Sequence, residues 1–431
     1  MKVCFLTLGC KVNQTENLAL AEQAAREGFE IVKETENPDA LIINTCTVTA
    51  IGSKKSRQLI RRVVKNHPRS LVVVMGCYAQ IHPGEVAKIE GIDLVLGTQD
   101  RRLVVKFLKE MQGRKRDKPI WGVKDFTRQG VAYEELPLIS GSRRVRAMLK
   151  IQDGCSQYCT YCIVPYARGP SRSRKPEQII AETKQLLEAG YKEIVLTGIH
   201  IGAYGQDLEP KTSLAELISQ LADLDGMTRL RLGSIEPMEF SEKLLELVTS
   251  KQVICPHFHI PLQSGADKIL ALMGRPYSTA DYAMLLQRIR KKLPEAAITT
   301  DIMAGFPGEE DGDHQRTLKF ITECDFASLH AFPYSRRPGT PAAEMPAQIA
   351  GKIKKARVRD LTKIGAESRK KYARKFVGSP VEVLVERVWE NGSAEGHTRN
   401  YLHLKIPPSS NGEKWSVGQL VTCEFKEEYL L

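Results

Sequence analysis

Three cysteines, Cys155, Cys159 and Cys162, lie within eight residues of one another in a C-x3-C-x2-C pattern. Thiolates spaced in this way can bind one inorganic cluster, and a [4Fe–4S] cubane held by three cysteines keeps one iron open to a small chelating ligand. A zinc site would need a fourth ligand at conventional spacing, and no His or Cys lies just downstream. The glycine and polar residues around the cysteines argue against a chance grouping in the core. The pattern therefore predicts a cluster with an open iron.

Three further cysteines, Cys10, Cys46 and Cys77, are far apart in the sequence but share one position relative to the expected strands. Each follows a strand-like apolar run, at residues 3–8, 41–44 and 71–75. If these strands are parallel, their carboxyl ends meet at one edge of a sheet, where open α/β sheets bind ligands. Ordinary buried cysteine is the alternative. The Gly, Asn and Thr residues in the three loops favour a second cluster site.

The remaining four cysteines fit no such pattern, and we assign Cys4, Cys255, Cys324 and Cys423 to core or neutral positions. Ten cysteines in 431 residues are too few for a disulfide scaffold. The chain begins without signal-peptide features and has no apolar run that could cross a bilayer. These observations predict a cytoplasmic protein with no membrane partner, in which cysteines serve as ligands or core residues.

Strand–helix alternation over the first hundred residues predicts a parallel sheet with helices on both faces. Residues 112–144 are interpreted as a linker, after which six strand–helix units predict an open barrel with its active site at the carboxyl ends of the strands. Short strands after residue 380 predict a small β-domain. We therefore expect an α/β multidomain chain: an N-terminal parallel α/β sandwich at 1–135, a partial (β/α)6 barrel at 143–370 and a small C-terminal β-barrel at 371–431.

Glycine and polar residues at the ends of the barrel strands are candidates to hold a small ligand beside the first cysteine trio. Each is a weak signal alone, because glycine at a strand end is usually only a turn. Together they fall on one face of the expected barrel. The candidates are Gly198, Arg231, Ser234, His259, Gln263 and Asp301.

The net charge of +12 suggests an anionic partner, with nucleic acid the first candidate. Residues 352–375 hold eleven basic and two acidic residues, a net charge of +9 beside the small β-domain. A solvated helix is the usual explanation of such a run, but its position favours contact with RNA phosphates. The RNA-contacting residues expected from sequence are Arg168, Arg172, Arg174, Lys370, Lys371, Arg374, Lys375, Arg399 and Tyr401.

The C-x3-C-x2-C pattern resembles the signature of the radical S-adenosylmethionine (SAM) superfamily. With the second trio included, almost the whole chain resembles the methylthiotransferases of that superfamily, and its C-terminal part resembles a TRAM domain, an RNA-binding barrel. The segments that carry the resemblance are residues 8–14, 44–48, 76–80 and 161–174.

The resemblance implies two [4Fe–4S] clusters and SAM as both methyl donor and radical source. Cys155, Cys159 and Cys162 would hold the cluster whose open iron chelates SAM, with Tyr161 near the adenine of SAM. Cys10, Cys46 and Cys77 would hold an auxiliary cluster that supplies the sulfur. The radical would remove the C2 hydrogen of a tRNA adenosine, to which the methylthio group is then joined. The implied partners are the anticodon stem-loop of tRNA and an electron donor such as flavodoxin or ferredoxin.

The residues around Cys10, Gly-Cys-Lys-Val-Asn-Gln, resemble the branch that acts on N6-threonylcarbamoyladenosine at position 37 of tRNA. Two other branches share the same domains and act on N6-isopentenyladenosine of tRNA or on ribosomal protein S12. The alternative from another class is a non-catalytic iron–sulfur RNA-binding protein. That alternative leaves unexplained an open three-cysteine site on a barrel edge lined with polar residues.

Overall fold

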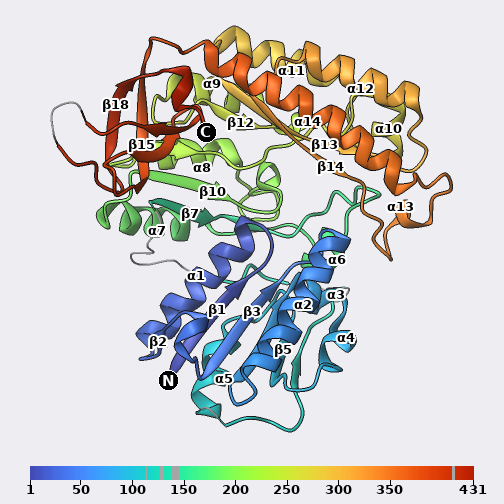
Figure 1. Cartoon of the computed structure of the whole chain (residues 1–431), viewed down its shortest axis with the longest axis vertical. Coiled ribbons are helices and arrows are strands. Elements are labelled where there is room, and N and C mark those ends of the chain that lie inside the picture. The colour runs from blue at the N-terminus through green and yellow to red at the C-terminus, as the bar shows by residue number, and fades with distance from the viewer. Residues whose placement is uncertain (113, 127–130, 137–144, 410–412) are drawn as a thin grey trace.

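A six-stranded parallel sheet forms the N-terminal part of the chain (Figure 1). The computed structural model describes residues 1–112, 114–126, 131–136, 145–409 and 413–431, so the expected boundary at residue 143 lies outside the described residues. The strand order is β2-β1-β3-β4-β5-β6. The strands are β1 (Lys2–Thr7), β2 (Glu30–Ile31), β3 (Ala40–Thr45), β4 (Leu71–Gly76), β5 (Leu94–Leu96) and β6 (Ile120–Gly122).

Helices cover both faces of this sheet because its central strands are apolar on both sides. Every residue of β3 and β4 is buried, the pattern of central strands in a parallel sheet. Two separate clusters of buried residues, around Leu20 and around Ile60, pack against the opposite faces. The helices are α1 (Lys11–Arg26), α2 (Ala50–Asn66), α3 (Cys77–Ile81), α4 (Pro83–Ala87) and α5 (Leu103–Met111). The predicted sandwich is confirmed.

One part of the segment interpreted as a linker belongs to the sheet. Strand β6 pairs in parallel with β5, Ile120 opposite Leu94. Its three residues are too few and too exposed to show a strand period in the sequence, which explains why the expectation of a linker at 112–144 was wrong for these residues.

The central part is the expected partial barrel of six parallel strands. Two three-stranded sheets, β11-β10-β7 and β12-β13-β14, are joined by a bridge between Ser234 and His259. The strands are β7 (Arg146–Lys150), β10 (Glu193–Thr197), β11 (Arg229–Arg231), β12 (His257–His259), β13 (Ala297–Ala304) and β14 (Ser328–Pro333). A short antiparallel pair, β8 (Gln152–Asp153) and β9 (Arg172–Ser173), follows β7.

Helices surround the barrel and connect its strands. They are α6 (Val164–Arg168), α7 (Pro176–Glu188), α8 (Leu214–Ala222), α9 (Glu242–Ser250), α10 (Asp267–Leu272), α11 (Thr279–Lys292), α12 (Asp311–Glu323), α13 (Pro341–Glu344) and α14 (Gly351–Arg374). None of the helices described in the chain is both long and apolar enough to pass through a membrane.

The C-terminal part is a four-stranded antiparallel sheet in the order β17-β16-β15-β18. Helix α14 lies against β13 and β14 of the barrel, while Tyr372, Ala373 and Phe376 at its end belong to the core of this sheet. The helix thus crosses the expected boundary at residue 370 without a break and fixes the sheet to the barrel. The strands are β15 (Pro380–Val388), β16 (Ala394–Thr398), β17 (His403–Ile406) and β18 (Leu420–Glu424).

Candidate active site between two cysteine trios

Cys10, Cys46 and Cys77 lie together at the carboxyl edge of the N-terminal sheet. They follow the adjacent strands β1, β3 and β4, and Cys10 and Cys46 flank the point where the strand order reverses. Such a switch point is where open α/β sheets bind ligands. Burial raises the pKa of the Cys77 thiol to about 12, nearby Arg168 lowers it, and the neighbouring Cys10 and Cys46 raise it again. The three thiols are therefore electrostatic neighbours, as the parallel topology predicted.

The loops around this trio are fixed by amides and by one glycine. The Asn13 side chain donates to Asn44 Oδ1 at 2.8 Å and accepts from the Cys10 thiol at 3.2 Å. Gly76 has φ +97°, and a Cβ there would lie 2.3 Å from Asn44 Oδ1. Glycine is needed because only it adopts this conformation at such a close approach, and helix α3 can then begin at Cys77.

Cys155, Cys159 and Cys162 lie in the loop after the first barrel strand. Burial raises the pKa of the Cys162 thiol to about 12, the Val164 N–H lowers it, and the adjacent Cys159 and Cys155 raise it. Arg275 Nη1 donates to Cys159 Sγ at 3.3 Å, and His200 Nδ1 lies 3.6 Å from Cys155 Sγ. Two of the three thiols thus have a neighbouring group that can stabilise negative sulfur.

The chemistry of both trios fits iron–sulfur clusters. All six cysteines are free thiols, and each trio includes both buried and more accessible members. Within the described part of the chain, no three His, Cys, Asp or Glu side chains are close enough to hold one metal ion. The cysteines of a cubane bind different irons, so a cluster does not require three of these side chains to meet at one ion, as a mononuclear zinc site does.

Gln152 joins the loop of the second trio to the end of the neighbouring strand. Its buried amide donates to the Gly154 carbonyl at 2.7 Å and to Ser171 Oγ at 2.9 Å. Its oxygen accepts from the N–H groups of Ile199 (3.0 Å) and His200 (2.8 Å). Gly198, predicted to line the SAM site, therefore lies in a turn that Gln152 holds next to the cysteine loop.

We expect Gln152→Leu to lower the free energy of unfolding by about 1–3 kcal/mol, because it leaves buried N–H and C=O groups unpaired. Urea denaturation of the cluster-free chain measures this. Gln152→Glu keeps the acceptor for Ile199 and His200 but sets a carboxylate oxygen against the Gly154 carbonyl, so it should lose at least as much. Equal stability of Gln152→Leu and the parent chain would contradict the role given to this amide.

Four of the predicted SAM-binding residues come together at the ends of the barrel strands. Ser234 bridges to His259, and His259 Nε2 lies 3.3 Å from Asp301 Oδ2. His330 Nδ1 approaches the other carboxylate oxygen of Asp301 at 3.4 Å. Burial opposes ionisation of Asp301, but the two histidines outweigh it and lower the pKa of this carboxyl. Gln263 is buried with φ +69°, and its Oε1 has no hydrogen-bond partner among the described residues.

The two cysteine trios are connected by five buried charged residues, named here the buried ion cluster: Glu16, Arg101, Lys150, Asp153 and Arg168. Arg168 Nη1 contacts Glu16 Oε1 at 2.9 Å and Asp153 Oδ1 at 2.8 Å. Lys150 Nζ lies 2.8 Å from Glu16 and 2.6 Å from Asp153, and Arg101 also pairs with Glu16.

Through this cluster a single side chain touches the surroundings of both trios. Arg168 Nη2 donates to Asn13 Oδ1 at 3.0 Å, the same oxygen that accepts from Cys10. Its contact with Asp153 is two residues from Cys155. A second link lies on the other side of the site, where Arg337 donates to Thr47 Oγ1 at 2.7 Å in the loop after Cys46.

Burial corrects the prediction that Arg168, Arg172 and Arg174 contact RNA. Each is at most 5% exposed. Arg172 lies 3.8 Å from Asp153, and Arg174 pairs with Glu182 and Glu135. These guanidinium groups are nearly inaccessible to solvent and lie beside carboxylates of the same chain.

Arg231, Arg399 and Tyr401 join the barrel to the C-terminal sheet, contacts that their predicted roles did not include. Arg231 pairs with Glu193 at 2.7 Å and donates to the Arg399 carbonyl at 2.9 Å. The Tyr401 ring stacks on His257 with centroids 4.5 Å apart and lies under the Arg231 guanidinium. Arg399 donates to the Thr228 and Ile254 carbonyls. The Arg231 guanidinium is therefore held by Glu193 and by the C-terminal sheet.

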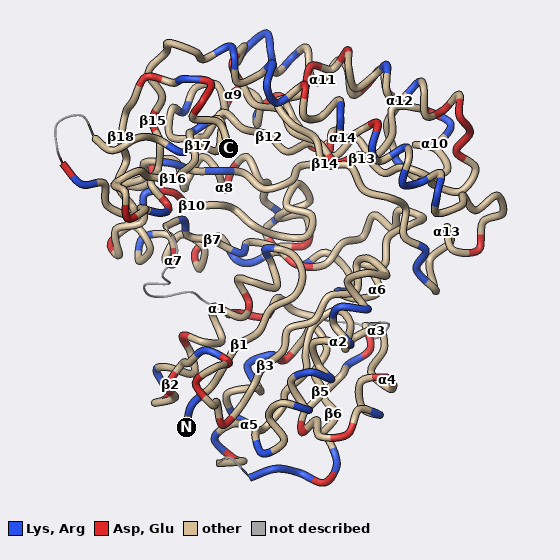
Figure 2. Tube along the Cα trace, in the orientation of Figure 1, with Lys and Arg blue, Asp and Glu red and all other residues tan. Residues whose placement is uncertain are grey.

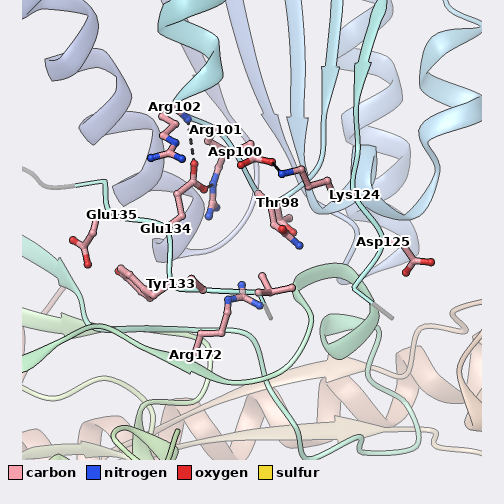
Figure 3. A pocket seen from close by; sticks show the side chains of 13 residues that line it. Thr98, Asp100, Arg101, Arg102, Lys124, Asp125, Tyr133, Glu134, Glu135 and Arg172 are labelled. Atoms are coloured by element: carbon pink, nitrogen blue, oxygen red, sulfur yellow. Dashed lines mark hydrogen bonds and ion pairs between the residues drawn. The ribbon is translucent and has the colours of Figure 1, made fainter. Parts of the chain in front are cut away.

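A cavity of about 680 Å³ lies beside the buried ion cluster, and neither cysteine trio lines it. The side chains of Arg101 and Arg172 enter it from opposite sides, and Glu134 lies between Arg102 and Tyr133 (Figure 3). Its walls mix both charges, with Lys124 paired to Asp100. We assign this cavity to the junction of the two domains.

The sequence-based prediction missed several site residues that interrupt or end an apolar pattern, because it rests only on the spacing of the apolar residues. Gln152 and Asp153 are polar residues at the end of an apolar strand, and Glu16 interrupts the apolar face of α1. Arg275 and Arg337 have no local pattern, because their partners are distant in sequence.

Comparison with known proteins matches both parts that hold the trios. Residues 2–97 match the Uncharacterized protein family UPF0004, and residues 149–321 match the Radical SAM superfamily. The threonylcarbamoyladenosine tRNA methylthiotransferase MtaB of Bacillus subtilis (strain 168) is 42% identical over 424 residues, 97% of this chain and 92% of that protein. The tRNA-2-methylthio-N(6)-dimethylallyladenosine synthase of Pelotomaculum thermopropionicum is 37% identical over 93% of this chain and 90% of that protein.

The fold is also similar to a solved radical SAM methyltransferase, TsrM from Kitasatospora setae. The TM-score is 0.58 at 16% identity, over 79% of this chain and 75% of that chain. At this identity the likeness concerns the fold alone.

Proposed function

The chain belongs to the methylthiotransferase family of radical SAM enzymes, and on that premise we propose that it converts N6-threonylcarbamoyladenosine of tRNA to the 2-methylthio derivative. The observation that carries the proposal is the pair of cysteine trios at strand ends of two domains, joined through Arg168. A non-catalytic iron–sulfur protein has no need of two such sites held in a fixed relation.

Each trio is proposed to hold one [4Fe–4S] cluster, and the strand ends of the barrel to hold SAM. Bound at the Cys155 loop, the cluster and SAM would supply a radical able to remove hydrogen, and a cluster held by Cys10, Cys46 and Cys77 would supply sulfur. The unpaired Gln263 Oε1 can accept a hydrogen bond from a bound ligand. The Asp301 carboxylate, kept ionised by His259 and His330, can orient a hydroxyl or amino group. Arg275 and His200 stabilise the thiolates they contact.

Substrate and electron donor follow from the family and not from a contact in this structure. We propose the anticodon stem-loop of tRNA as substrate and a flavodoxin or ferredoxin as donor. The C-terminal sheet is proposed to act as a TRAM-type RNA-binding module. Its position against the barrel, fixed by Arg231 and Tyr401, would keep bound RNA in register with the site.

Deletion of the gene tests the substrate assignment. We expect tRNA from the deletion strain to lack 2-methylthio-N6-threonylcarbamoyladenosine, measured by mass spectrometry of nucleosides, and a plasmid copy to restore it. Loss of the methylthio derivative of N6-isopentenyladenosine instead would assign the chain to the other tRNA branch. Unchanged tRNA with an altered ribosomal protein S12 would refute a tRNA substrate.

A further inference from the structure

The basic residues of helix α14 are of two kinds. Near its end, three of the four predicted RNA contacts are paired with acidic side chains, and the fourth, Lys370, is exposed. Lys371 Nζ lies 2.7 Å and Lys375 Nζ 2.9 Å from the Asp325 carboxylate. Arg374 Nη2 lies 2.9 Å from Glu427. These three residues, predicted from sequence to contact RNA, already have carboxylates beside them.

The first half of α14 holds three exposed basic residues without an acidic partner among the residues that the structure describes: Lys352, Lys355 and Arg359. Their spacing of three and four residues places them along one face of the helix. Arg357 turns inward to Glu309 at 2.8 Å, and Asp360 is engaged by His314 at 3.1 Å. These three residues therefore keep their positive charges without a partner in the described part of the chain; Figure 2 marks the Lys and Arg positions of the chain in blue.

This face borders a groove at the carboxyl end of the barrel. The groove measures about 620 Å³, and its lining combines Lys352, Lys355 and Arg359 with the apolar Pro333, Ala356 and Val358. Pro333 is the last residue of β14, so the groove opens at the barrel edge that also holds the predicted SAM-binding residues.

The polypeptide that follows Pro333 contacts the loop after Cys46, one of the three cysteines of the N-terminal trio. Two residues after Pro333, Ser335 Oγ accepts from the Ala50 N–H at 2.8 Å, four residues beyond Cys46. Arg337 then contacts Thr47 and Ser53. The groove is therefore only a few residues along the chain from the contacts with the loop that follows Cys46.

We propose that Lys352, Lys355 and Arg359 bind the phosphates of the RNA strand next to the modified nucleotide, with the sugar or base faces against Pro333 and Val358. The proposal rests on the proposed function and adds a location for the RNA backbone. Uncompensated cations bind phosphate by releasing counterions, and an apolar floor accepts the faces of unpaired nucleotides. The paired cations at the end of α14 contribute less, because contact with RNA would first require them to leave their carboxylates.

Two charge-matched variants of the cluster-loaded chain test this. One is Lys352→Ala/Lys355→Ala/Arg359→Ala, and the control is Lys371→Ala/Arg374→Ala/Lys375→Ala. Binding of a fluorescent anticodon stem-loop RNA is measured anaerobically from low to moderate KCl. We expect the first variant to lose at least tenfold in affinity at low salt, with a salt slope reduced by about two to three, at roughly 0.7–0.9 per lost phosphate contact. The control should lose less than about threefold.

Equal losses in the two variants would overturn the proposal, since net charge alone would then explain binding. An unchanged slope in the first variant, with melting temperatures matching the parent, would also overturn it. If the parent chain methylthiolates tRNA and only the α14 proposal fails, the function stands. If the parent chain neither binds nor modifies the RNA, the proposed function and this inference fail together.

Discussion

Replacing Glu16 by Gln is expected to lower the free energy of unfolding by about 3–5 kcal/mol, the cost of breaking a buried ion pair and leaving charge uncompensated. Glu16 is 1% exposed and is contacted by Arg101, Lys150 and Arg168. The substitution keeps the shape of the side chain but removes the charge that these cations share. Urea denaturation followed by circular dichroism measures the change. Glu110→Gln, in an exposed pair with Lys106 on α5, is the matched control and should change stability by less than about 0.5 kcal/mol.

The same cluster gives the stability a dependence on pH. Burial opposes ionisation of Glu16, but Arg101, Arg168 and Lys150 outweigh it and hold the pKa of the carboxyl below its ordinary value. A carboxyl with a lowered pKa in the folded state stabilises above its unfolded pKa, near 4.3, and this contribution is lost as the pH falls. The parent chain should therefore lose more stability than Glu16→Gln between about pH 5 and pH 3. Parallel pH profiles would contradict the account.

Replacing Cys10, Cys46 and Cys77 together by Ala is expected to remove about half of the bound iron, because each trio would hold one four-iron cluster. The separation of the two sites in different domains is the physical reason for independent loss. Iron and sulfide are measured after anaerobic reconstitution, and SAM cleavage to 5′-deoxyadenosine is measured on the same samples. SAM cleavage should persist, since Cys155, Cys159 and Cys162 remain.

The control for this variant replaces three cysteines that lie outside both trios, Cys4, Cys324 and Cys423, by Ala. It should keep full iron content, showing that the loss follows position and not cysteine number. Full iron content in the Cys10/Cys46/Cys77 variant would contradict the second site. Complete loss of iron would show that the two sites are not independent.

The grouping of Cys10, Cys46 and Cys77 could be predicted from the sheet topology. The direction in which a strand-end side chain points could not. Cys10, Cys46 and Cys77 could be grouped because apolar runs mark parallel strands and parallel strands end at one edge. Arg231 lies at a strand end too, yet its side chain pairs with Glu193 and the C-terminal sheet. Sequence spacing gives the position of a residue on a strand but not the distant element that packs on it.

The sequence also does not show which charged residues pair with one another. Arg168 and Glu16 are 152 residues apart, so no local pattern indicates their ion pair, and Arg168 is predicted to be a surface cation. Of the eleven basic residues in 352–375, those predicted from sequence to contact RNA are Lys370, Lys371, Arg374 and Lys375. Only the fold shows that Asp325 and Glu427 pair with three of these four, while Lys352, Lys355 and Arg359 have no such partner in the described part of the chain.

The most direct measurement is the product of the purified, cluster-loaded chain acting on tRNA that carries N6-threonylcarbamoyladenosine, with SAM and reductant under anaerobic conditions. Mass spectrometry of the nucleosides should show the 2-methylthio derivative from the parent chain. The Cys10/Cys46/Cys77 variant should form only 5′-deoxyadenosine, and a Cys155/Cys159/Cys162 variant should form neither. Release of 5′-deoxyadenosine by the parent chain with the tRNA left unmodified would contradict the account.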